Sequence, residues 1–307
     1  MKENANLNSA AKRIVVDWGS TNFRAKLVVD GEVVDQVQSA DGIRLRGNRD
    51  FDEILNLHCG HWAEAHSDIP VIMSGMIGSR EGWREIPYVA APASVADLAA
   101  GLVAVPSQYF DSVVIVPGVR SDDAANGTTD VMRGEETQVI GLLESIPTGP
   151  PVTICLPGTH SKWIVCRDGR IDRFRTWLTG EAFDRLTHES LIAGTGGEVE
   201  LDSPAFSRGL ALADTEGGLL HHLFLGRTEM LTGRIKPTEL RSLISGLLIG
   251  HELREARAFA EGTVFLVGDS PAAAATAKGM AFIGLTANRI VADTHLAGVL
   301  AIEAARK

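Results

Sequence analysis

The sequence of 307 residues contains few cysteines, few aromatic residues and no long apolar run. Its three cysteines, Cys59, Cys155 and Cys166, form no CxxC pair and no cysteine–histidine pair with metal-ligand spacing, so a disulfide framework is not expected. No apolar run approaches the roughly 18–20 residues that span a bilayer, and residues 1–13 lack the apolar core of a signal peptide. We therefore expect a cytoplasmic protein that makes no membrane contact.

Acidic residues outnumber basic residues in this chain. Lys and Arg total 29 against 39 Asp and Glu, which gives a formal net charge of -10. Because the sequence also lacks any Lys/Arg block, neither a nucleic acid nor an anionic membrane is expected as the main partner. A few local arginines are still enough to bind a small anionic substrate.

The length and the ordinary globular composition, 45% hydrophobic and 22% charged, are typical of two folded domains. Residues 14–36 and 154–174 share one order of features: an apolar strand, a Gly-Ser/Thr turn, a strand with basic residues and an Asp-Gly hairpin. Residues 147–151 (PTGPP) cannot continue a helix and are typical of a connection. We expect two related α/β domains, 1–147 and 148–307, with the terminal helix 294–306 packing at their interface.

Local patterns predict the elements of both halves. The first half begins with strands at 13–17, 23–30 and 32–38, and the Asp30-Gly31 dipeptide predicts a two-residue hairpin. Helices are expected behind Asp50, behind Ser94 and from Gly134, with strands between them. In the second half, local patterns predict helices at 181–191, 237–259 and 271–285 and a strand at 263–267.

Two turns are candidates for phosphate binding. Residues 17–22 (DWGSTN) place a carboxylate at a strand end before a turn that offers backbone N–H groups and hydroxyls. Such a loop can approach phosphate oxygens while the carboxylate orients hydrated Mg²⁺, although a plain hairpin turn has the same composition. Residues 156–162 (LPGTHSK) offer a second turn of this kind, and two such turns could clamp a triphosphate. Walker A and GxGxxG patterns are absent.

Three further segments have both a functional and a structural interpretation. Residues 132–137 (MRGEET) place two carboxylates at a helix start, where one could accept a proton from an attacking hydroxyl or simply complement the helix dipole. Residues 267–271 (VGDSP) form a strand-to-helix turn that suits either the approach of adenine or ribose or an ordinary helix cap. Residues 74–79 (SGMIGS) follow a strand, as many ligand loops do, and could equally pack their own Met.

In combination these motifs resemble the 2-dehydro-3-deoxygalactonokinases, which are sugar-acid kinases in the superfamily of hexokinase, glycerol kinase, acetate kinase, the heat-shock chaperone ATPases and actin. The motifs are DWGSTNFRA (17–25), SGMIGSREGW (74–83), MRGEETQ (132–138), LPGTHSKW (156–163), FRTWLTGE (174–181) and SGLLIGHE (245–252). The resemblance implies two ribonuclease-H-like domains with mixed sheets flanked by helices and an ATP cleft between them. It also implies ATP and Mg²⁺ as cofactors, and transfer of the γ-phosphate to the 6-hydroxyl of 2-dehydro-3-deoxygalactonate in galactonate catabolism.

The resemblance assigns roles to single residues. Asp17 is expected to bind Mg²⁺ through the water molecules of the ion. The residues expected around the nucleotide are Gly19, Ser20, Thr21, Gly158, Thr159, Gly268, Asp269 and Ser270. The second loop departs from the superfamily's common acidic form, because Leu156 stands where an Asp is often found. Glu135 is the expected catalytic base, with Glu136 second, because glycerol-kinase-like enzymes place an acid at a helix start after a glycine.

The substrate side is assigned from the chemistry of a sugar acid. Its carboxylate needs a fixed cation, for which Arg24 and Arg133 are the candidates, and the hydroxyl contacts are expected from Asn22, Gly75, Met76 and Ser79. Residues 179–181 are a further candidate for the cleft. Two alternatives stay open: a kinase for another sugar or sugar acid, and a nucleotide-switched actin-like or chaperone-like ATPase. The expected partner is a small sugar acid, with a homodimer as an option for the assembly.

Overall fold

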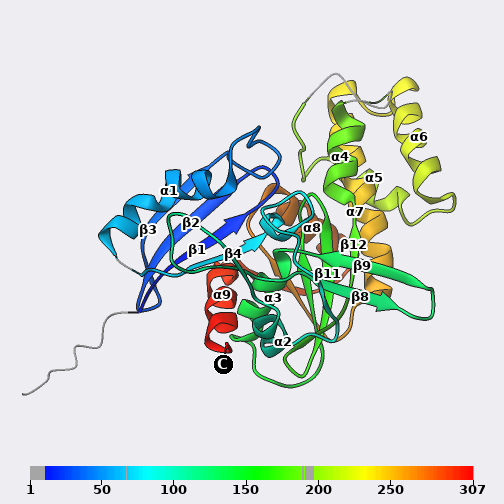
Figure 1. The fold of residues 1–307 in the computed structure, drawn as a ribbon. Helices are drawn as coiled ribbons and strands as arrows, with labels where there is room; N and C mark the ends of the chain where they lie inside the picture. The colour runs from blue at the N-terminus through cyan, green and yellow to red at the C-terminus, as the bar shows by residue number, and fades with distance from the viewer. Residues whose placement is uncertain (1–10, 67, 189, 191–196, 307) are drawn as a thin grey trace, which may run out of the picture. The chain divides into compact units, whose positions relative to one another are not determined.

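The computed structural model describes residues 11–66, 68–188, 190 and 197–306. Within them the chain forms two compact units (Figure 1). Unit 1 contains the residues up to Pro147, Gly169–Ile171 and the residues from Asp293 on, and unit 2 contains Thr148–Asp168 and Asp172–Ala292. The C-terminal segment from Asp293 therefore groups with the first half of the chain, whereas the sequence analysis places it with the second half.

Unit 1 is built on a six-stranded mixed sheet with the order β3-β2-β1-β4-β7-β6. Its strands are β1 (Lys12–Trp18), β2 (Phe23–Val29), β3 (Glu32–Ser39), β4 (Val71–Gly75), β6 (Val103–Val105) and β7 (Val113–Ile115). The first three run antiparallel, and β4 runs parallel to both β1 and β7. Asp30 and Gly31 join β2 to β3 with positive φ angles of 50° and 87°, so the predicted two-residue hairpin is confirmed.

Helices cover this sheet. The helix α1 (Phe51–Ala65) begins at the N-cap Asp50 and buries Ile54, Leu55 and Trp62 in the same core as the strands (Figure 1). The short α2 (Val95–Ala100) begins with a capping box formed by Ser94 and Asp97. The short 3₁₀ helix η1 (Met76–Gly78) follows β4 directly.

The C-terminal helix α9 (Thr294–Ala304) lies against α3 (Glu135–Leu143) (Figure 1). A Cβ atom added at Gly141 would lie 2.6 Å from the backbone nitrogen of Gly298, and one added at Gly298 would lie 3.0 Å from that of Gly141. The two backbones therefore approach as closely as only small residues allow. This tertiary contact is the physical reason that the last helix groups with unit 1.

A separate three-stranded sheet in unit 1 was not predicted. It has the order β5-β8-β9 and consists of β5 (Val89–Ala90), β8 (Val119–Asp123) and β9 (Thr128–Met132). Its strand β5 has only two residues, and β8 and β9 are short and rich in polar residues, so they lack the apolar pattern that marks the other strands. The last of them, β9, runs directly into the start of α3.

Unit 2 repeats the first part of this topology. Its five-stranded sheet has the order β12-β11-β10-β13-β14, formed by β10 (Val152–Leu156), β11 (Ser161–Arg167), β12 (Arg170–Trp177), β13 (Thr263–Val267) and β14 (Ala287–Ile290). As in unit 1, the first strand pairs antiparallel with the second strand and parallel with a later one. The predicted α/β fold class, with mixed sheets flanked by helices, is confirmed.

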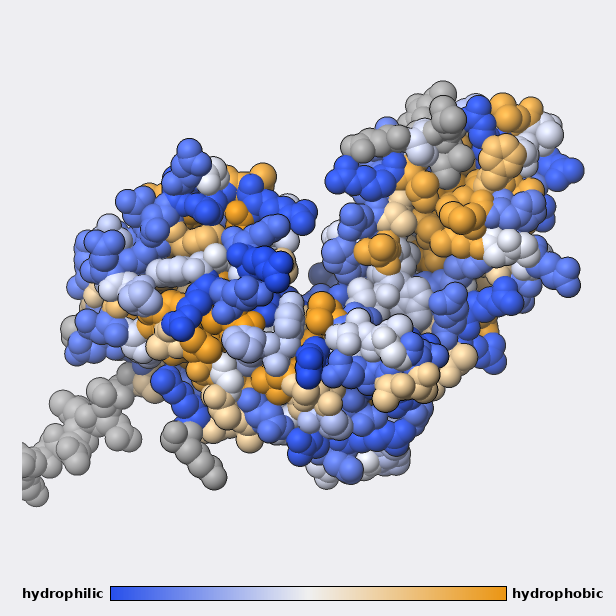
Figure 2. Space-filling view, turned by 45° about the vertical axis from the view of Figure 1, so that its right-hand side comes forward, coloured by the Kyte–Doolittle hydropathy of each residue, from blue (hydrophilic) through white to orange (hydrophobic). Residues whose placement is uncertain are grey.

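The helices of unit 2 are α4 (Thr179–His188), α5 (Pro204–Leu212), α6 (Gly218–Leu231), α7 (Leu240–Phe259) and α8 (Pro271–Phe282), with the 3₁₀ turn η2 (Pro237–Glu239) before α7. The predictions for α4, α7 and α8 are confirmed over most of their lengths, while α5 and α6 were missed. Apolar side chains gather on the helical part of this unit (Figure 2), where α6 exposes Leu219, Leu220, Phe224 and Leu231. No helix in the described ranges has the length and apolar character needed to cross a membrane.

Candidate active site

The first part of the site is the end of β1 in unit 1. The sheet register places Asp17 opposite Arg24 on β2 and beside Ser74 on β4. The Arg24 Nη1 atom lies 3.3 Å from the Asp17 Oδ2 atom, and both side chains are partly exposed. Three neighbouring strands therefore present a cation, a carboxylate and a hydroxyl side by side.

Asp17 and Arg24 line a cavity of about 280 Å³. Its lining residues are Val15, Asp17, Arg24, Lys26, Gln138, Asp293 and His295. Lys26 forms an ion pair with Asp293, and His295 Nε2 lies 2.7 Å from Ser74 Oγ. Burial lowers the pKa of Lys26, and the Asp17 charge opposes this shift. Burial also lowers the pKa of His295, which favours its neutral imidazole. The charged groups of the cavity are then the carboxylates of Asp17 and Asp293 and the cations of Arg24 and Lys26.

The end of β4 and the start of α3 meet next to Asp17. Gly75 has a φ of 92°, and a Cβ atom there would lie 2.8 Å from the Trp18 carbonyl oxygen and 3.4 Å from Asp17 Oδ1. Gly134 has a φ of 108°, and its Cβ would lie 3.2 Å from the Gly75 Cα atom. Both positions therefore require glycine. The contact brings the expected first phosphate loop beside the helix that carries the expected base.

Glu135 and Glu136 both turn back toward the start of α3. Glu135 Oε2 accepts a hydrogen bond of 3.1 Å from the Arg133 backbone nitrogen, and Glu136 Oε2 accepts one of 2.7 Å from that of Gly134. Glu135 is half-buried, whereas Glu136 is fully buried and its Oε1 atom has no partner among the described residues. Burial raises the pKa of Glu136 to about 8, and the nearby Glu135 charge adds to the shift.

Arg133 is a buried cation between these acids and η1. Its Nη2 atom donates a 2.7 Å hydrogen bond to the Ile86 carbonyl oxygen, and its guanidinium lies 4.3 Å from the centre of the Tyr88 ring. In the described part of the chain, its Nε and Nη1 atoms are buried without a hydrogen-bond partner. Unsatisfied N–H groups on a buried guanidinium are costly.

The other predicted residues of unit 1 lie around these groups. Ser20 and Thr21 form the two-residue turn between β1 and β2, in which the Gly19 nitrogen donates to the Asn22 carbonyl oxygen over 2.9 Å. The amide of Gly19 is therefore already used by the protein. Met76 starts η1, and the buried Ser79 Oγ atom has no partner among the described residues.

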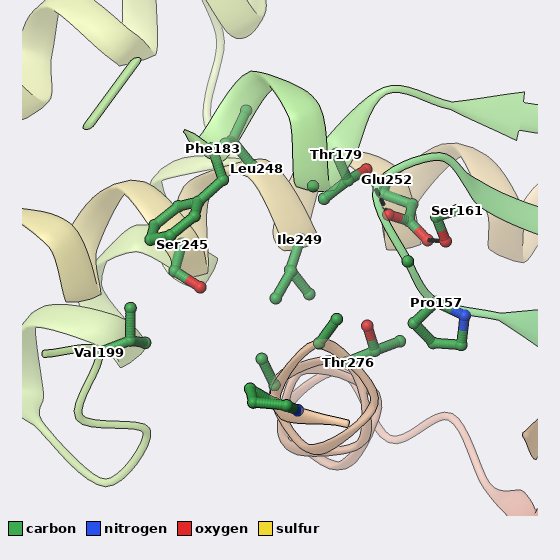
Figure 3. A pocket seen from close by; sticks show the side chains of 15 residues that line it. Pro157, Ser161, Thr179, Phe183, Val199, Ser245, Leu248, Ile249, Glu252 and Thr276 are labelled. Atoms are coloured by element: carbon green, nitrogen blue, oxygen red, sulfur yellow. Dashed lines mark hydrogen bonds between the residues drawn. The ribbon is translucent and has the colours of Figure 1, made fainter. Parts of the chain in front are cut away.

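Unit 2 contains a second, mainly apolar cavity of about 190 Å³ (Figure 3). One face of α7 lines it with Ser245, Leu248, Ile249 and Glu252, which have the i, i+3, i+4, i+7 spacing of a single helix face. The remaining lining residues are Pro157, Gly158, Ser161, Thr179, Gly180, Phe183, Val199, Pro271, Ala272, Ala275 and Thr276. Figure 3 shows the polar groups Glu252, Ser161 and Thr179 together at one end, and Val199, Phe183 and Ser245 at the other.

The two predicted nucleotide turns of unit 2 relate differently to this cavity. Gly158 lines it directly, and Thr159 is the exposed neighbour of Gly158. The turn at Gly268, Asp269 and Ser270 does not line it, although Pro271 and Ala272 after it do. Ser270 is the N-cap of α8 and accepts a 3.2 Å hydrogen bond from the Ala273 nitrogen, so its hydroxyl has a structural role.

Sequence reasoning missed four residues that the structure brings into these cavities. Lys26 alternates with Arg24 along β2, and strand periodicity could have placed both on one face. Glu252 closes the SGLLIGHE motif and was not singled out within it. Asp293 and His295 reach the first cavity only through the packing of α9 on unit 1, and no local signal in the sequence indicates this.

Comparison with known proteins places the chain among sugar-acid kinases. The profile of the 2-keto-3-deoxy-galactonokinase family matches residues 17–302. A protein of Rhizobium meliloti (strain 1021) named as a probable 2-dehydro-3-deoxygalactonokinase is 34% identical over 259 residues, which cover 82% of each chain. The 2-dehydro-3-deoxygalactonokinase of Escherichia coli (strain K12) is 32% identical over 297 residues, covering 95% of this chain and 97% of that protein.

A solved structure from Sinorhizobium meliloti that carries the same kinase name has a TM-score of 0.85 and 31% identity, and the match covers 94% of this chain and 97% of that one. The family resemblance stated from the motifs is therefore confirmed. The chain belongs to the 2-keto-3-deoxy-galactonokinase family.

Proposed function

We propose that this protein transfers the γ-phosphate of ATP to the 6-hydroxyl of 2-dehydro-3-deoxy-D-galactonate, giving the 6-phosphate and ADP. Membership of a kinase family supports phosphoryl transfer from ATP. The observation that carries the proposal is the meeting of Asp17, Gly75 and Gly134, because it sets a phosphate-loop carboxylate beside the acidic start of α3. Phosphoryl transfer depends on such positioning of phosphates, metal and base.

The base that we propose is Glu135. A general base must be ionised before it can accept a proton, and its carboxylate must be within reach of the substrate hydroxyl. Glu135 is only half-buried, whereas Glu136 is fully buried and has a pKa of about 8, so it keeps its proton at neutral pH. We assign Glu136 to the second place, as a neutral group at the start of α3.

The residue that we propose for the substrate carboxylate is Arg133. Arg24 already pairs with Asp17, whereas Arg133 keeps two buried N–H groups without partners in the described ranges. A carboxylate bound there would satisfy these donors and offset the cost of burying the guanidinium. The nearby Met76 and Ser79 of the η1 segment, with Gly75 and Asn22, stay as the proposed contacts of the sugar hydroxyls.

Mg²⁺ is proposed at Asp17. Proteins hold Mg²⁺ with one or two carboxylates plus substrate phosphates, and Asp17 and Asp293 line one cavity. The described residues contain no cluster of three or more His, Cys, Asp or Glu that would hold a metal alone, which is consistent with a site shared with the nucleotide. Asp17 would hold the water shell of Mg²⁺, and the bound ion would supply neutralisation of the phosphate charge.

We propose the apolar cavity of unit 2 for the nucleoside. Gly158 and Thr159 would then face the phosphates, and the start of α8 after the turn at Gly268, Asp269 and Ser270 would face the adenosine. The predominantly apolar lining with a few polar groups at one end supports this use. The ATP cleft that the resemblance implies between the two units stays a prediction.

Product analysis tests the proposed reaction. The protein is incubated with Mg-ATP and 2-dehydro-3-deoxygalactonate, and phosphorus-proton correlation NMR then locates the new phosphate ester. A phosphate on C6 supports the proposal. A phosphate on another carbon, or free inorganic phosphate as the only product, contradicts it.

A cytoplasmic location and a homodimer also stay proposals. The exposed apolar residues of α6, including Leu220 and Phe224, offer a contact surface between two copies. Light scattering after gel filtration would support the dimer with twice the chain mass of 32.8 kDa, and a monomer mass would contradict it.

A further inference from the structure

Glu252 on α7 is a buried carboxylate outside the assigned roles. It is 2% exposed and lines the cavity of unit 2. Its Oε1 atom accepts a hydrogen bond from Ser161 Oγ over 2.6 Å, and its Oε2 atom accepts one from Thr179 Oγ1 (Figure 3). The Oε1 atom also accepts a hydrogen bond from Trp163 Nε1 over 2.8 Å. One carboxylate thus receives three neutral donors from two different elements, β11 and α4.

Two of those donors, Ser161 and Thr179, belong to elements that contact the second phosphate turn. Ser161 is the first residue of β11, directly after the turn, and Thr179 is the first residue of α4. The start of α4 is also in close contact with the turn, because a Cβ atom at Gly180 would lie 2.8 Å from the Thr159 Cα atom. The Glu181 nitrogen donates a 2.9 Å hydrogen bond to the Thr159 carbonyl oxygen. Movement of α4 or of β11 would therefore displace the turn.

A carboxylate is an unusual choice for a purely structural contact at this place. Burial raises the pKa of Glu252, and the three donated hydrogen bonds oppose that shift. Desolvating a carboxylate is costly, and apolar residues of similar volume often stabilise a core at least as well. What a carboxylate offers here is the ability to accept several hydrogen bonds at once and so to fix several elements in one geometry.

We propose that Glu252 is a positioning residue for the nucleotide: by holding Ser161, Trp163 and Thr179, it keeps the Gly158-Thr159 turn and the first turn of α4 in the arrangement that receives the triphosphate. This inference rests on the proposed use of that turn for ATP. It assigns to Glu252 an effect on nucleotide binding that is separate from the chemistry at Asp17 and Glu135.

The test compares Glu252→Gln with Glu255→Gln. Glutamine keeps the size of Glu252 but replaces one accepting oxygen by an NH₂ donor, which conflicts with the Trp163 N–H or with a hydroxyl. Glu255 lies on the same helix, is exposed and accepts a 3.2 Å hydrogen bond from Trp177, so it is a matched control outside the cavity. In Glu252→Gln we expect the KM for ATP to rise roughly 10-fold to 100-fold, the effect of losing one charge-assisted hydrogen bond, with the KM for the sugar acid within about 2-fold.

Direct binding separates this inference from the proposed reaction. Calorimetric titration with ADP measures nucleotide affinity whichever acceptor the enzyme uses, and it should show the same loss in Glu252→Gln and none in Glu255→Gln. Unchanged ADP affinity in a folded Glu252→Gln protein, or equal rises in both KM values, would overturn the inference. If Glu252→Gln does not fold, Trp163→Phe removes the donor that does not line the cavity; weaker ADP binding by this variant supports the positioning role, and unchanged binding overturns it.

Discussion

The protonation of Glu136 links the start of α3 to the pH dependence of stability. Its pKa rises from 4.5 in the unfolded chain to about 8 in the folded protein, chiefly because the carboxyl is fully buried. The folded state therefore binds this proton more tightly. The resulting stabilisation is fully present below pH 4.5, declines as the pH rises and is lost once the pH passes about 8.

The size of this effect follows from the same shift. The rise in pKa from 4.5 to about 8 contributes on the order of 5 kcal/mol to the free energy of unfolding, at about 1.4 kcal/mol per pKa unit. In Glu136→Gln the side chain stays neutral at every pH, so this contribution does not change. Between pH 5 and pH 9 the wild type should therefore lose several kcal/mol of stability relative to the variant.

Urea unfolding followed by circular dichroism at pH 5, 6, 7, 8 and 9 measures this difference. Subtracting the variant from the wild type removes the titration of the other groups. The expected result is a difference that grows between pH 5 and pH 8 and then levels off. Parallel stability profiles for the wild type and Glu136→Gln would refute the assignment of a buried, protonated carboxyl.

Three further substitutions test the proposed site of unit 1. Glu135→Gln should lower kcat by a factor on the order of 10²–10⁴ with the KM for ATP largely kept, and by more than Glu136→Gln does; the opposite ranking in steady-state kinetics would move the base to Glu136. Arg133→Ala should raise the KM for the sugar acid far more than that for ATP, and equal effects on both would count against a carboxylate contact. Gly134→Ala should destabilise the protein by about 1–3 kcal/mol, because alanine at a φ of 108° is strained and its Cβ meets Gly75; an unchanged thermal midpoint would contradict that contact.

Local sequence patterns were sufficient for the elements that bury an apolar face. The hairpin at Asp30-Gly31 and the strand β13 are where turn chemistry and a β-branched run place them. The small sheet of β8 and β9 was missed because its strands alternate polar residues on a surface that is mostly exposed. The helix α5 was missed although Ser203 at its N-cap and Pro204 at its first position are a helix-start signal, whereas α6 begins at Gly217 without a side-chain cap.

The residues of the candidate site also divide into those that the sequence indicates and those that only tertiary packing brings to the cavities. The family resemblance singled out Asp17 and Glu135, the charge of a sugar acid singled out Arg133, and all three lie in unit 1. Their roles stay predictions, because contacts alone do not show what a residue does during turnover. Residues such as His295 and Glu252 reach their cavities through the packing of distant helices, so local sequence patterns do not reveal them.

The measurement that tests the central claim most directly is ADP release by the purified protein with Mg-ATP. The acceptors to compare are 2-dehydro-3-deoxygalactonate, its 4-epimer 2-dehydro-3-deoxygluconate, galactonate and glucose, together with a sample that has no acceptor. We predict strong stimulation by 2-dehydro-3-deoxygalactonate alone. Preference for another acceptor would contradict the proposed substrate while keeping the kinase, and equal ADP release without any acceptor would contradict the kinase itself.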